Sequence, residues 1–357
     1  MPYKVLVVDD SQFFRRRLTD IINEHPDLTV VGIAENGREA VEKAASLQPD
    51  IISMDYEMPV LNGVSAIREI MEARPVPILM FSSMTYEGAR ITLDALEAGA
   101  LDFVPKDFAE VSSNAAALKR KLHSKLLDIV RSRPKLDADR AGSTNILRES
   151  PKSQGGTPTG ETSGEGGEAS LGQLKSKVSV LIIGASTGGP VALTEVLTRL
   201  PATFSLPILL VQHMPENFTK AFAERLNKQC KIGVKEAEDG DQLRAGAALL
   251  APGGKQMMFD PQHRGQVKVL PGDNRVNYRP SVDITFGSAA NVYGDKVLGI
   301  VLTGMGSDGC EGARLLKNKG STIWSQNEAS CVIYGMPMAV ARKTLSERVM
   351  AGLGNAK

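Results

Sequence analysis

Apolar runs rich in β-forming residues alternate with helix-like segments through the first part of the chain. The runs are apolar almost throughout rather than on one face, which is typical of a parallel sheet covered by helices on both sides. The expected strands are KVLVV, LTVVGIA, DIISM, ILMFS and DFVP, and a last helix is expected around residues 115–130. Five strands alternating with five helices predict a flavodoxin-like α/β domain.

The same alternation returns in the last half of the chain. Predicted strands VSVLIIGA, PILLVQH, AALLAPG and KVLGIVLTG are separated by the helix-like segments VALTEVLTRL, FTKAFAERLN and GARLLKNKG. This pattern predicts a second, larger, doubly wound and Rossmann-like α/β domain.

Between these halves the composition changes. Residues 132–177 contain no aromatic residue and no valine, and they are rich in Gly, Ser, Thr, Pro and Glu. Such a stretch buries too little apolar surface to offset its chain entropy, so it predicts a flexible linker. The expected domains are therefore residues 1–131 and 178–350, joined by the linker at 132–177.

Composition limits the classes of function. The 357 residues are 42% hydrophobic with a formal net charge of +1, so the chain can fill two cores but has no general basic field for nucleic acid. No apolar run reaches the roughly 18 residues needed to span a bilayer, and the N-terminus does not resemble a signal peptide. A soluble cytoplasmic protein without membrane insertion is expected. The three cysteines form no C-x-x-C pair, which argues against a zinc site or a disulfide framework.

Acidic residues follow two strands of the first predicted sheet. Asp9 and Asp10 come directly after the first strand, and Asp55 closes the third. The carboxyl ends of parallel strands meet at one edge of a sheet, where three carboxylates would repel one another unless a divalent cation such as Mg²⁺ neutralised them. A single aspartate in such a place is more often a helix or turn cap.

Two further residues favour a functional site over helix or turn caps. Ser82 ends the fourth strand and is placed to hydrogen-bond a phosphoryl oxygen, while Lys106 follows the fifth strand and is placed to pair with it as a point charge. Acidic, serine and lysine side chains at four successive strand ends favour a metal-dependent phosphoryl acceptor over a set of caps.

The first ~125 residues resemble a response-regulator receiver domain through VVDD, MDYEMP with Gly63 after it, FSS and VPK. The resemblance implies that Asp55 accepts phosphate from a histidine kinase. It also implies that Mg²⁺ is held by Asp10, Asp55 and the main-chain carbonyl of Glu57, and that Phe103 is the switch aromatic. One departure concerns the loop after the fifth strand. Receivers usually carry proline after the lysine, whereas here the order is Pro-Lys-Asp over residues 105–107.

In the second domain, the segment VSVLIIGASTGGP fits the G-x-S-x-G nucleophile pattern between a strand and a helix beginning near Pro190. Small flanking residues allow a strained turn that exposes the Ser186 hydroxyl, and main-chain amides at the helix start can stabilise an oxyanion. Two alternatives remain on this motif alone. The turn can cradle a nucleotide phosphate, or Ser186 and Thr187 can cap the helix.

The histidines favour a hydrolase. Only His213 and His263 lie in the second domain, and His213 ends the next strand at the same expected sheet edge as Ser186. His263 lies in a polar loop segment, so His213 is the better general base. A dinucleotide site would instead place an acidic residue at that strand end, where Gln212 and His213 stand.

Asp308 follows a further strand at the same edge and is the leading third member, although an isolated aspartate there is more often a helix cap. Asp283 and Asp295 are weaker candidates. The order Ser186, His213, Asp308 differs from that of α/β-hydrolases, in which the histidine comes last, so that superfamily is excluded.

The set IGASTGGP, VQHMP, LAPGGKQ, RPSVD, LTGMGSDG and YGMPMAV resembles the catalytic domain of chemotaxis methylesterases, over residues 178–342. The resemblance implies a triad of Ser186, His213 and Asp308, with the amides of Thr187 and Met305 in the oxyanion hole. It implies demethylation of glutamate methyl esters, and deamidation of glutamines, on methyl-accepting chemotaxis receptors. No cofactor is then needed for the ester chemistry. A non-catalytic nucleotide-binding or docking module is the main alternative, and a DNA-binding regulator is less favoured because the output half is a long α/β domain.

Overall fold

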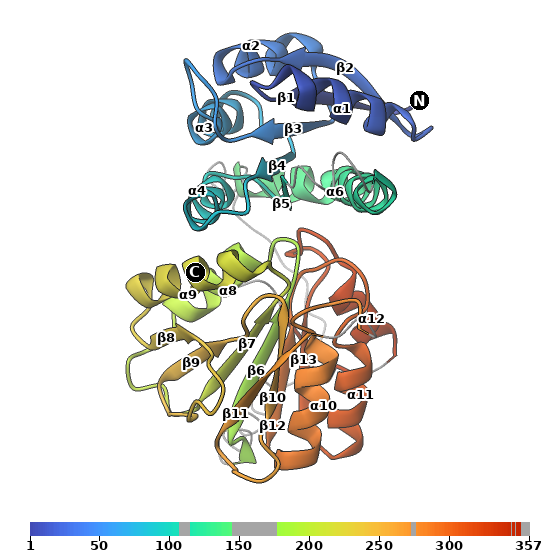
Figure 1. Cartoon of the computed structure of the whole chain (residues 1–357). Helices are drawn as coiled ribbons and strands as arrows, with labels where there is room; N and C mark the ends of the chain where they lie inside the picture. The colour runs from blue at the N-terminus through green and yellow to red at the C-terminus, as the bar shows by residue number, and fades with distance from the viewer. Residues whose placement is uncertain (107–114, 145–176, 273–275, 344, 347, 351–357) are drawn as a thin grey trace, which may run out of the picture.

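The computed structural model describes residues 1–106, 115–144, 177–272, 276–343, 345–346 and 348–350. The chain forms two α/β domains, one above the other in Figure 1, with the smaller one at the N-terminus. Most of the predicted linker lies outside the described residues. None of the helices in the described ranges combines the length and the apolar character needed to cross a membrane.

The N-terminal domain contains a five-stranded parallel sheet in the order β2-β1-β3-β4-β5. Its strands are β1 (Tyr3–Val8), β2 (Leu28–Ala34), β3 (Ile51–Asp55), β4 (Ile78–Ser82) and β5 (Asp102–Pro105). Its described helices are α1 (Gln12–Asn23), α2 (Gly37–Leu47), α3 (Gly63–Ala73), α4 (Tyr86–Glu97) and α6 (Ala115–Thr144). This strand order is the flavodoxin-like one, as predicted.

Alternate residues of β1 enter two different apolar layers. Leu6 and Val8 pack with α2, α3 and α4, whereas Val5 and Val7 pack with α1 and α6. All four side chains are buried, which explains why the strand is apolar on both faces. The helix α6 continues to Thr144, beyond the end near residue 130 that the sequence predicts.

The C-terminal domain is built on a seven-stranded sheet in the order β14-β13-β12-β6-β7-β9-β8, with every described pair parallel. The strands are β6 (Val180–Ala185), β7 (Ile208–Gln212), β8 (Gly233–Glu236), β9 (Ala247–Leu250), β12 (Val297–Val301), β13 (Thr322–Gln326) and β14 (Arg348–Met350). A separate antiparallel hairpin is formed by β10 (Lys255–Phe259) and β11 (Val267–Pro271). The predicted doubly wound domain is confirmed.

Helices cover both faces of this sheet. On one face lie α8 (Gly189–Thr198) and α9 (Glu216–Gln229), and on the other lie α10 (Val282–Tyr293), α11 (Cys310–Asn318) and α12 (Met336–Arg342). From β6 the chain winds outward in one direction through β7 and in the other through β12. The carboxyl end of β6 is therefore the point where the winding reverses, which is where open α/β sheets place their working sites.

The two domains meet through α4 and β5 of the first and α8 and α9 of the second, while α6 packs on the loops around Met305 and Val332 (Figure 1). Phe103 of β5 stacks on Phe218 of α9, with ring centroids 4.4 Å apart and planes 5° from parallel. Arg225 of α9 pairs with Glu97 and, at 2.5 Å, with Asp94, both on α4. The interface thus combines an apolar contact with peripheral ion pairs.

Candidate active site and phosphoacceptor pocket

Three neighbouring strands of the larger sheet lead to the candidate catalytic residues. Ser186 follows β6, His213 follows β7, and Asp308 lies in the loop between β12 and α11. Because β12, β6 and β7 are adjacent and parallel, their carboxyl ends bring these residues to one edge of the sheet.

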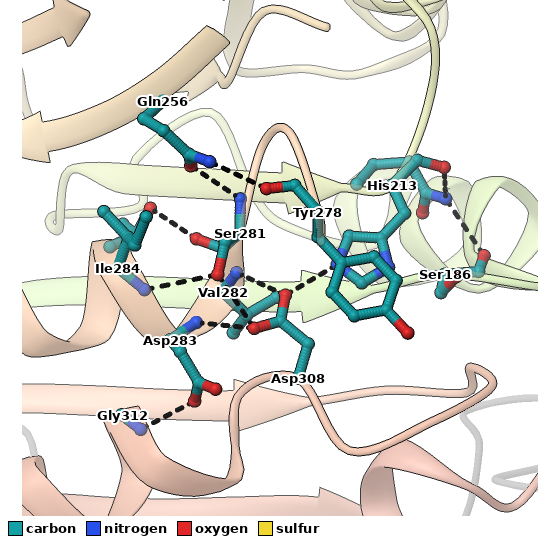
Figure 2. Close-up of polar contacts among 12 residues, drawn as sticks. Ser186, His213, Gln256, Tyr278, Ser281, Val282, Asp283, Ile284, Asp308 and Gly312 are labelled. Carbon is teal, nitrogen blue, oxygen red and sulfur yellow. Dashed lines mark hydrogen bonds and ion pairs between the residues drawn. The ribbon is translucent and has the colours of Figure 1, made fainter. Parts of the chain in front are cut away.

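His213 and Asp308 form a direct pair. The Nε2 atom of His213 lies 2.7 Å from Oδ2 of Asp308, and the two side chains are 10% and 3% exposed. The other ring nitrogen, Nδ1, is buried and has no hydrogen-bond partner within the described part of the chain. Since Asp308 occupies Nε2, Nδ1 is the nitrogen available to a serine hydroxyl. Figure 2 shows Ser186 on the side of His213 away from Asp308.

Asp308 lies at the N-terminus of α10 and accepts several hydrogen bonds there. Its carboxylate accepts from Ser281 Oγ at 2.9 Å and from the amides of Val282 at 2.7 Å and Asp283 at 3.0 Å. Burial alone would raise the pKa of Asp308, but hydrogen bonds from His213 and these amides outweigh burial and lower the pKa. Asp308 is therefore ionised at neutral pH and fixed in orientation.

The weaker candidates do not contact His213 in the described structure. Asp283 accepts from the Gly312 amide at 2.7 Å, and burial together with the nearby charge of Asp308 raises the pKa of Asp283 to about 6. Asp295 pairs with Lys177 at 3.6 Å, and the exposed His263 pairs with Asp260 at 3.0 Å.

The turn after β6 is held tightly by the main chain. The Ser186 amide donates to Thr303 O at 3.0 Å, and the Ser186 carbonyl accepts from the Gly189 amide at 2.7 Å. The buried side chain of Gln212 donates to the same carbonyl at 2.9 Å. Gly188 has a φ of +77°, and a Cβ there would lie 2.7 Å from Val332, so only glycine fits this turn.

The two predicted oxyanion-hole residues line the same cavity as Ser186 and His213. Within the described residues, neither the Thr187 amide nor the Met305 amide donates to another main-chain group. The Thr187 hydroxyl, however, donates to Asp102 of the N-terminal domain at 2.5 Å. The Met305 sulfur lies 3.5 Å from the Ser124 hydroxyl of α6.

Both domains therefore line the cavity over the triad, which has a volume of about 660 Å³. The C-terminal domain contributes Ser186, Thr187, His213, Met214, Pro215, Glu216, Gly254, Asn277, Tyr278, Arg279 and Met305. The N-terminal domain contributes Met84, Asp102, Phe103, Pro105, Lys121 and Lys125. Residues of the N-terminal domain thus form part of the wall of the cavity that contains Ser186 and His213.

The acidic cluster forms a second site, at the carboxyl edge of the smaller sheet. Ligand oxygens of Asp9, Asp10 and Asp55 all lie within 4.8 Å of one another, a donor set that suits Mg²⁺. Lys106 pairs with Asp9 at 2.8 Å and with Asp55 at 3.0 Å, so its reordered neighbours do not keep it out of the pocket. Burial, followed by the charge of Asp9, raises the pKa of Asp55 to about 6.

The other predicted residues of this pocket lie in different settings. Ser82 is buried and donates to Gly88 O at 3.2 Å, which links the end of β4 to α4. Glu57 is exposed in the loop after β3. Phe103 is buried against Phe218, so the expected switch aromatic lies at the domain interface.

Sequence reasoning missed several residues that support the triad: Gln212, Gln256, Tyr278 and Ser281. A serine just before the apolar start of α10 is an N-cap signal, and Ser281 does accept from the Ile284 amide. The other three had no local signal, because each acts through a partner distant in sequence.

A receiver-type acidic pocket joined to a serine, histidine and aspartate site on a parallel sheet defines a response regulator with a hydrolase output domain. Residues 181–352 match the family model described as CheB methylesterase, and residues 5–117 match that of the response regulator receiver domain. The chain belongs to the CheB methylesterase family.

Similar proteins cover nearly the whole chain. A protein-glutamate methylesterase/protein-glutamine glutaminase 1 of Saccharophagus degradans is 56% identical, covering 98% of this chain and 96% of its own. A protein of that name from Pseudomonas aeruginosa is 55% identical with the same coverage. The crystal structure of the Thermotoga maritima CheB methylesterase catalytic domain is 38% identical, covers 49% of this chain and 93% of its own, and has a TM-score of 0.47.

Proposed function

We propose that this chain hydrolyses the methyl esters of glutamate side chains on methyl-accepting chemotaxis receptors, and deamidates receptor glutamines, under the control of its receiver domain. The observation that carries the proposal is the meeting of Ser186, His213 and Asp308 at one sheet edge, in a chain of this family. Sensory adaptation is the corresponding cellular role.

The first chemical step forms an acyl-enzyme. Nδ1 of His213 removes the proton from Ser186 as the Oγ atom attacks the ester carbonyl carbon. Asp308 stays ionised, holds the Nε2–H tautomer of the imidazole and stabilises the imidazolium that forms. The amides of Thr187 and Met305 donate to the oxyanion. Collapse of the tetrahedral intermediate breaks the bond to the methoxy oxygen, which takes the proton from His213 and leaves as methanol.

The second step restores the enzyme. His213 takes a proton from water as the water oxygen attacks the acyl carbonyl, and the proton passes to Ser186 Oγ as the glutamate carboxyl product leaves. The same sequence on a glutamine side chain releases ammonia in place of methanol. One nucleophile thus serves both activities.

The receiver pocket supports phosphoryl transfer to Asp55 from a histidine kinase. Asp9, Asp10 and Asp55, with the main-chain carbonyl of Glu57, would hold Mg²⁺, which when bound neutralises charge around the transferred phosphoryl group. Lys106 already bridges two of the carboxylates, and the proposal assigns it to a phosphoryl oxygen after transfer. Ser82 must then turn from Gly88 to reach the same group.

The proposed control of the hydrolase depends on β5, which links the phosphorylation site to the active site. Lys106, just beyond its end, contacts Asp55, while Asp102 at its start accepts from Thr187 beside the nucleophile. Phosphorylation of Asp55 that shifts Lys106 therefore acts on the same short strand that contacts the active site. We propose that the phosphorylated receiver moves away from the cavity and admits the receptor.

Methanol release from a methyl-esterified receptor cytoplasmic domain tests the proposal. Replacing Ser186 by alanine should lower kcat by at least ~10⁴-fold, because the attacking oxygen is gone. The exposed Ser205→Ala variant is the matched control and should keep the full rate. Unchanged turnover by Ser186→Ala would reject the assignment.

A separate arm tests receiver control. A small phosphodonor with Mg²⁺ should raise the rate of the unmodified chain and leave that of Asp55→Ala unchanged. A rise of equal size in Asp55→Ala would contradict control through this aspartate.

A further inference from the structure

The imidazole of His213 is covered on one face by an aromatic ring. The phenol ring of Tyr278 lies parallel to it, with centroids 4.2 Å apart and planes 8° from parallel. Figure 2 shows this ring lying across His213, while Asp308 meets the imidazole at its edge. Rotation of the imidazole about its Cβ–Cγ bond would sweep the ring through the space that Tyr278 occupies.

The orientation of this imidazole has chemical consequences. Asp308 binds Nε2, which leaves the buried Nδ1 to accept the Ser186 proton. A rotation of 180° about Cβ–Cγ would exchange each ring nitrogen with a carbon, so neither Asp308 nor Ser186 would face a nitrogen. Only one of the two flip states is therefore competent as a general base.

Tyr278 is itself held from behind by Gln256 of β10. The buried Gln256 amide donates through Nε2 to Tyr278 O at 2.7 Å and accepts through Oε1 from the Ser281 amide at 2.9 Å. Ser281 in turn donates its hydroxyl to Asp308 at 2.9 Å. One amide group thus fixes the residue that covers His213 and the residue that orients Asp308.

The far end of the Tyr278 ring lies near the loop of the predicted oxyanion hole. A Cβ at Gly306, next to Met305, would come within 2.8 Å of the Tyr278 hydroxyl oxygen. Gly306 also has a φ of +87°, which favours glycine. The ring therefore fills the space between the general base and this loop, with little room to shift toward either.

We infer that Tyr278 and Gln256 are positioning residues that keep His213 in the single flip state and tautomer in which Nε2 donates to Asp308 and Nδ1 faces Ser186. The catalytic consequence rests on the proposed function, whereas the orientation of the imidazole does not. The ring face of Tyr278 carries this role, and its hydroxyl does not.

Nitrogen NMR of the full-length chain tests the orientation directly. In histidine labelled with ¹⁵N, chemical shifts tell which ring nitrogen carries the proton, and His213→Gln identifies the His213 signals. The unmodified chain and Tyr278→Phe, which keeps the ring, should give one Nε2–H species. Tyr278→Leu should give a mixture of states, and Gln256→Met, which removes both hydrogen bonds, should give a smaller shift in the same direction.

Kinetics provide the second measurement. Tyr278→Leu should lower kcat by ~10–100-fold with KM within about twofold, because a misoriented base affects chemistry more than binding. Tyr278→Phe should recover nearly all of the rate. A single unchanged His213 species in Tyr278→Leu and in Gln256→Met, each folded by circular dichroism, would overturn the inference. Altered His213 signals in a chain without esterase activity would uphold the inference and reject the proposed function.

Discussion

At the scale of single residues, the surroundings of two neighbouring carboxyls shift their pKa values in opposite directions. Asp308 is hydrogen-bonded by His213 and by two amides, which lower its pKa although it is buried. Asp283, whose main-chain amide donates to Asp308 at 3.0 Å, has its pKa raised to about 6 by burial and by the charge of Asp308. Asp308 is therefore kept ionised, and its negative charge makes ionisation of Asp283 less favourable.

Asp283→Asn should therefore stabilise the chain in a pH-dependent way. The folded chain binds the Asp283 proton more tightly than the unfolded chain does. The contribution of this protonated carboxyl to the free energy of unfolding is therefore fully present below the unfolded pKa near 3.8 and is lost as the pH rises through about 6. Asparagine keeps an acceptor for the Gly312 amide without the charge. At pH 7.5 the variant should gain about 1 kcal/mol in free energy of unfolding, and at pH 4 most of this gain should be lost.

Thermal unfolding followed by circular dichroism between pH 4 and 7.5 measures this difference. Asp295→Asn is the control, because Asp295 is exposed in a 3.6 Å pair with Lys177. A gain from Asp283→Asn that is equal at both ends of the pH range would show that the charge is not its source.

The candidate catalytic residues could be predicted from the sequence because each follows an apolar strand. Ser186, His213 and Asp308 all follow such runs, and parallel strands deliver their carboxyl ends to one edge. Tyr278 and Gln256 could not be predicted in this way. Gln256 hydrogen-bonds Tyr278 22 positions away, and Tyr278 stacks on His213 from a different loop, so no local spacing in the sequence indicates either residue.

At the scale of elements, β5 is the strand that contacts both the rest of its own domain and the catalytic domain. Asp102 at its start accepts from Thr187 at 2.5 Å, pairs with Lys125 of α6 and accepts from the amide of Phe103 at 2.8 Å. Phe103 is itself stacked on Phe218. The four-residue strand β5 thus makes both a polar and an apolar contact with the catalytic domain.

Asp102→Ala should raise the methanol-release rate of the unphosphorylated enzyme. Loss of the acceptor leaves the buried Thr187 hydroxyl unpaired in the docked state, which costs about 1–2 kcal/mol and shifts docking by ~5–30-fold. The rate should rise several-fold, and further activation by phosphorylation should shrink. Asp94→Ala, which removes a more exposed contact, should raise the rate by less than about twofold. An unchanged rate in folded Asp102→Ala would argue against this contact as a restraint.

The interface itself had no signature in the sequence. Thr187 and Asp102 are 85 positions apart and belong to separate folding units, so neither hydrophobic period nor motif spacing relates them. The sheets were predictable because strands buried on both faces are apolar along their whole length. The extension of α6 to Thr144 was not, since its last turns follow from a sequence that resembles the linker in composition.

At the scale of the whole molecule, the two domains lie one above the other (Figure 1), and residues of both line one cavity. Phosphorylation of Asp55 should separate them and so raise the radius of gyration measured by small-angle X-ray scattering. The expected increase requires Mg²⁺ and a small phosphodonor together, because the acidic cluster must be neutralised before it accepts phosphate.

Asp55→Ala is the control for that measurement and should keep the compact radius under all conditions. The double variant Asp55→Ala with Asp102→Ala should be partly expanded without phosphodonor, since it loosens the interface directly. If the phosphorylated chain gains activity while its radius of gyration stays constant, then phosphorylation acts through changes inside the cavity and not by separating the domains.

The ion pairs at the rim of the interface have a consequence for the resting enzyme. Arg225 meets Asp94 and Glu97, whose side chains are 52% and 63% exposed, so dissolved salt reaches this contact freely. The Debye length falls from about 8 Å at 0.15 M to about 3 Å at 1 M, whereas the buried Thr187–Asp102 bond is little affected. Osmotic upshift concentrates ions around the protein. It should therefore raise the rate at which the unphosphorylated enzyme demethylates receptors and shift the baseline from which a cell adapts.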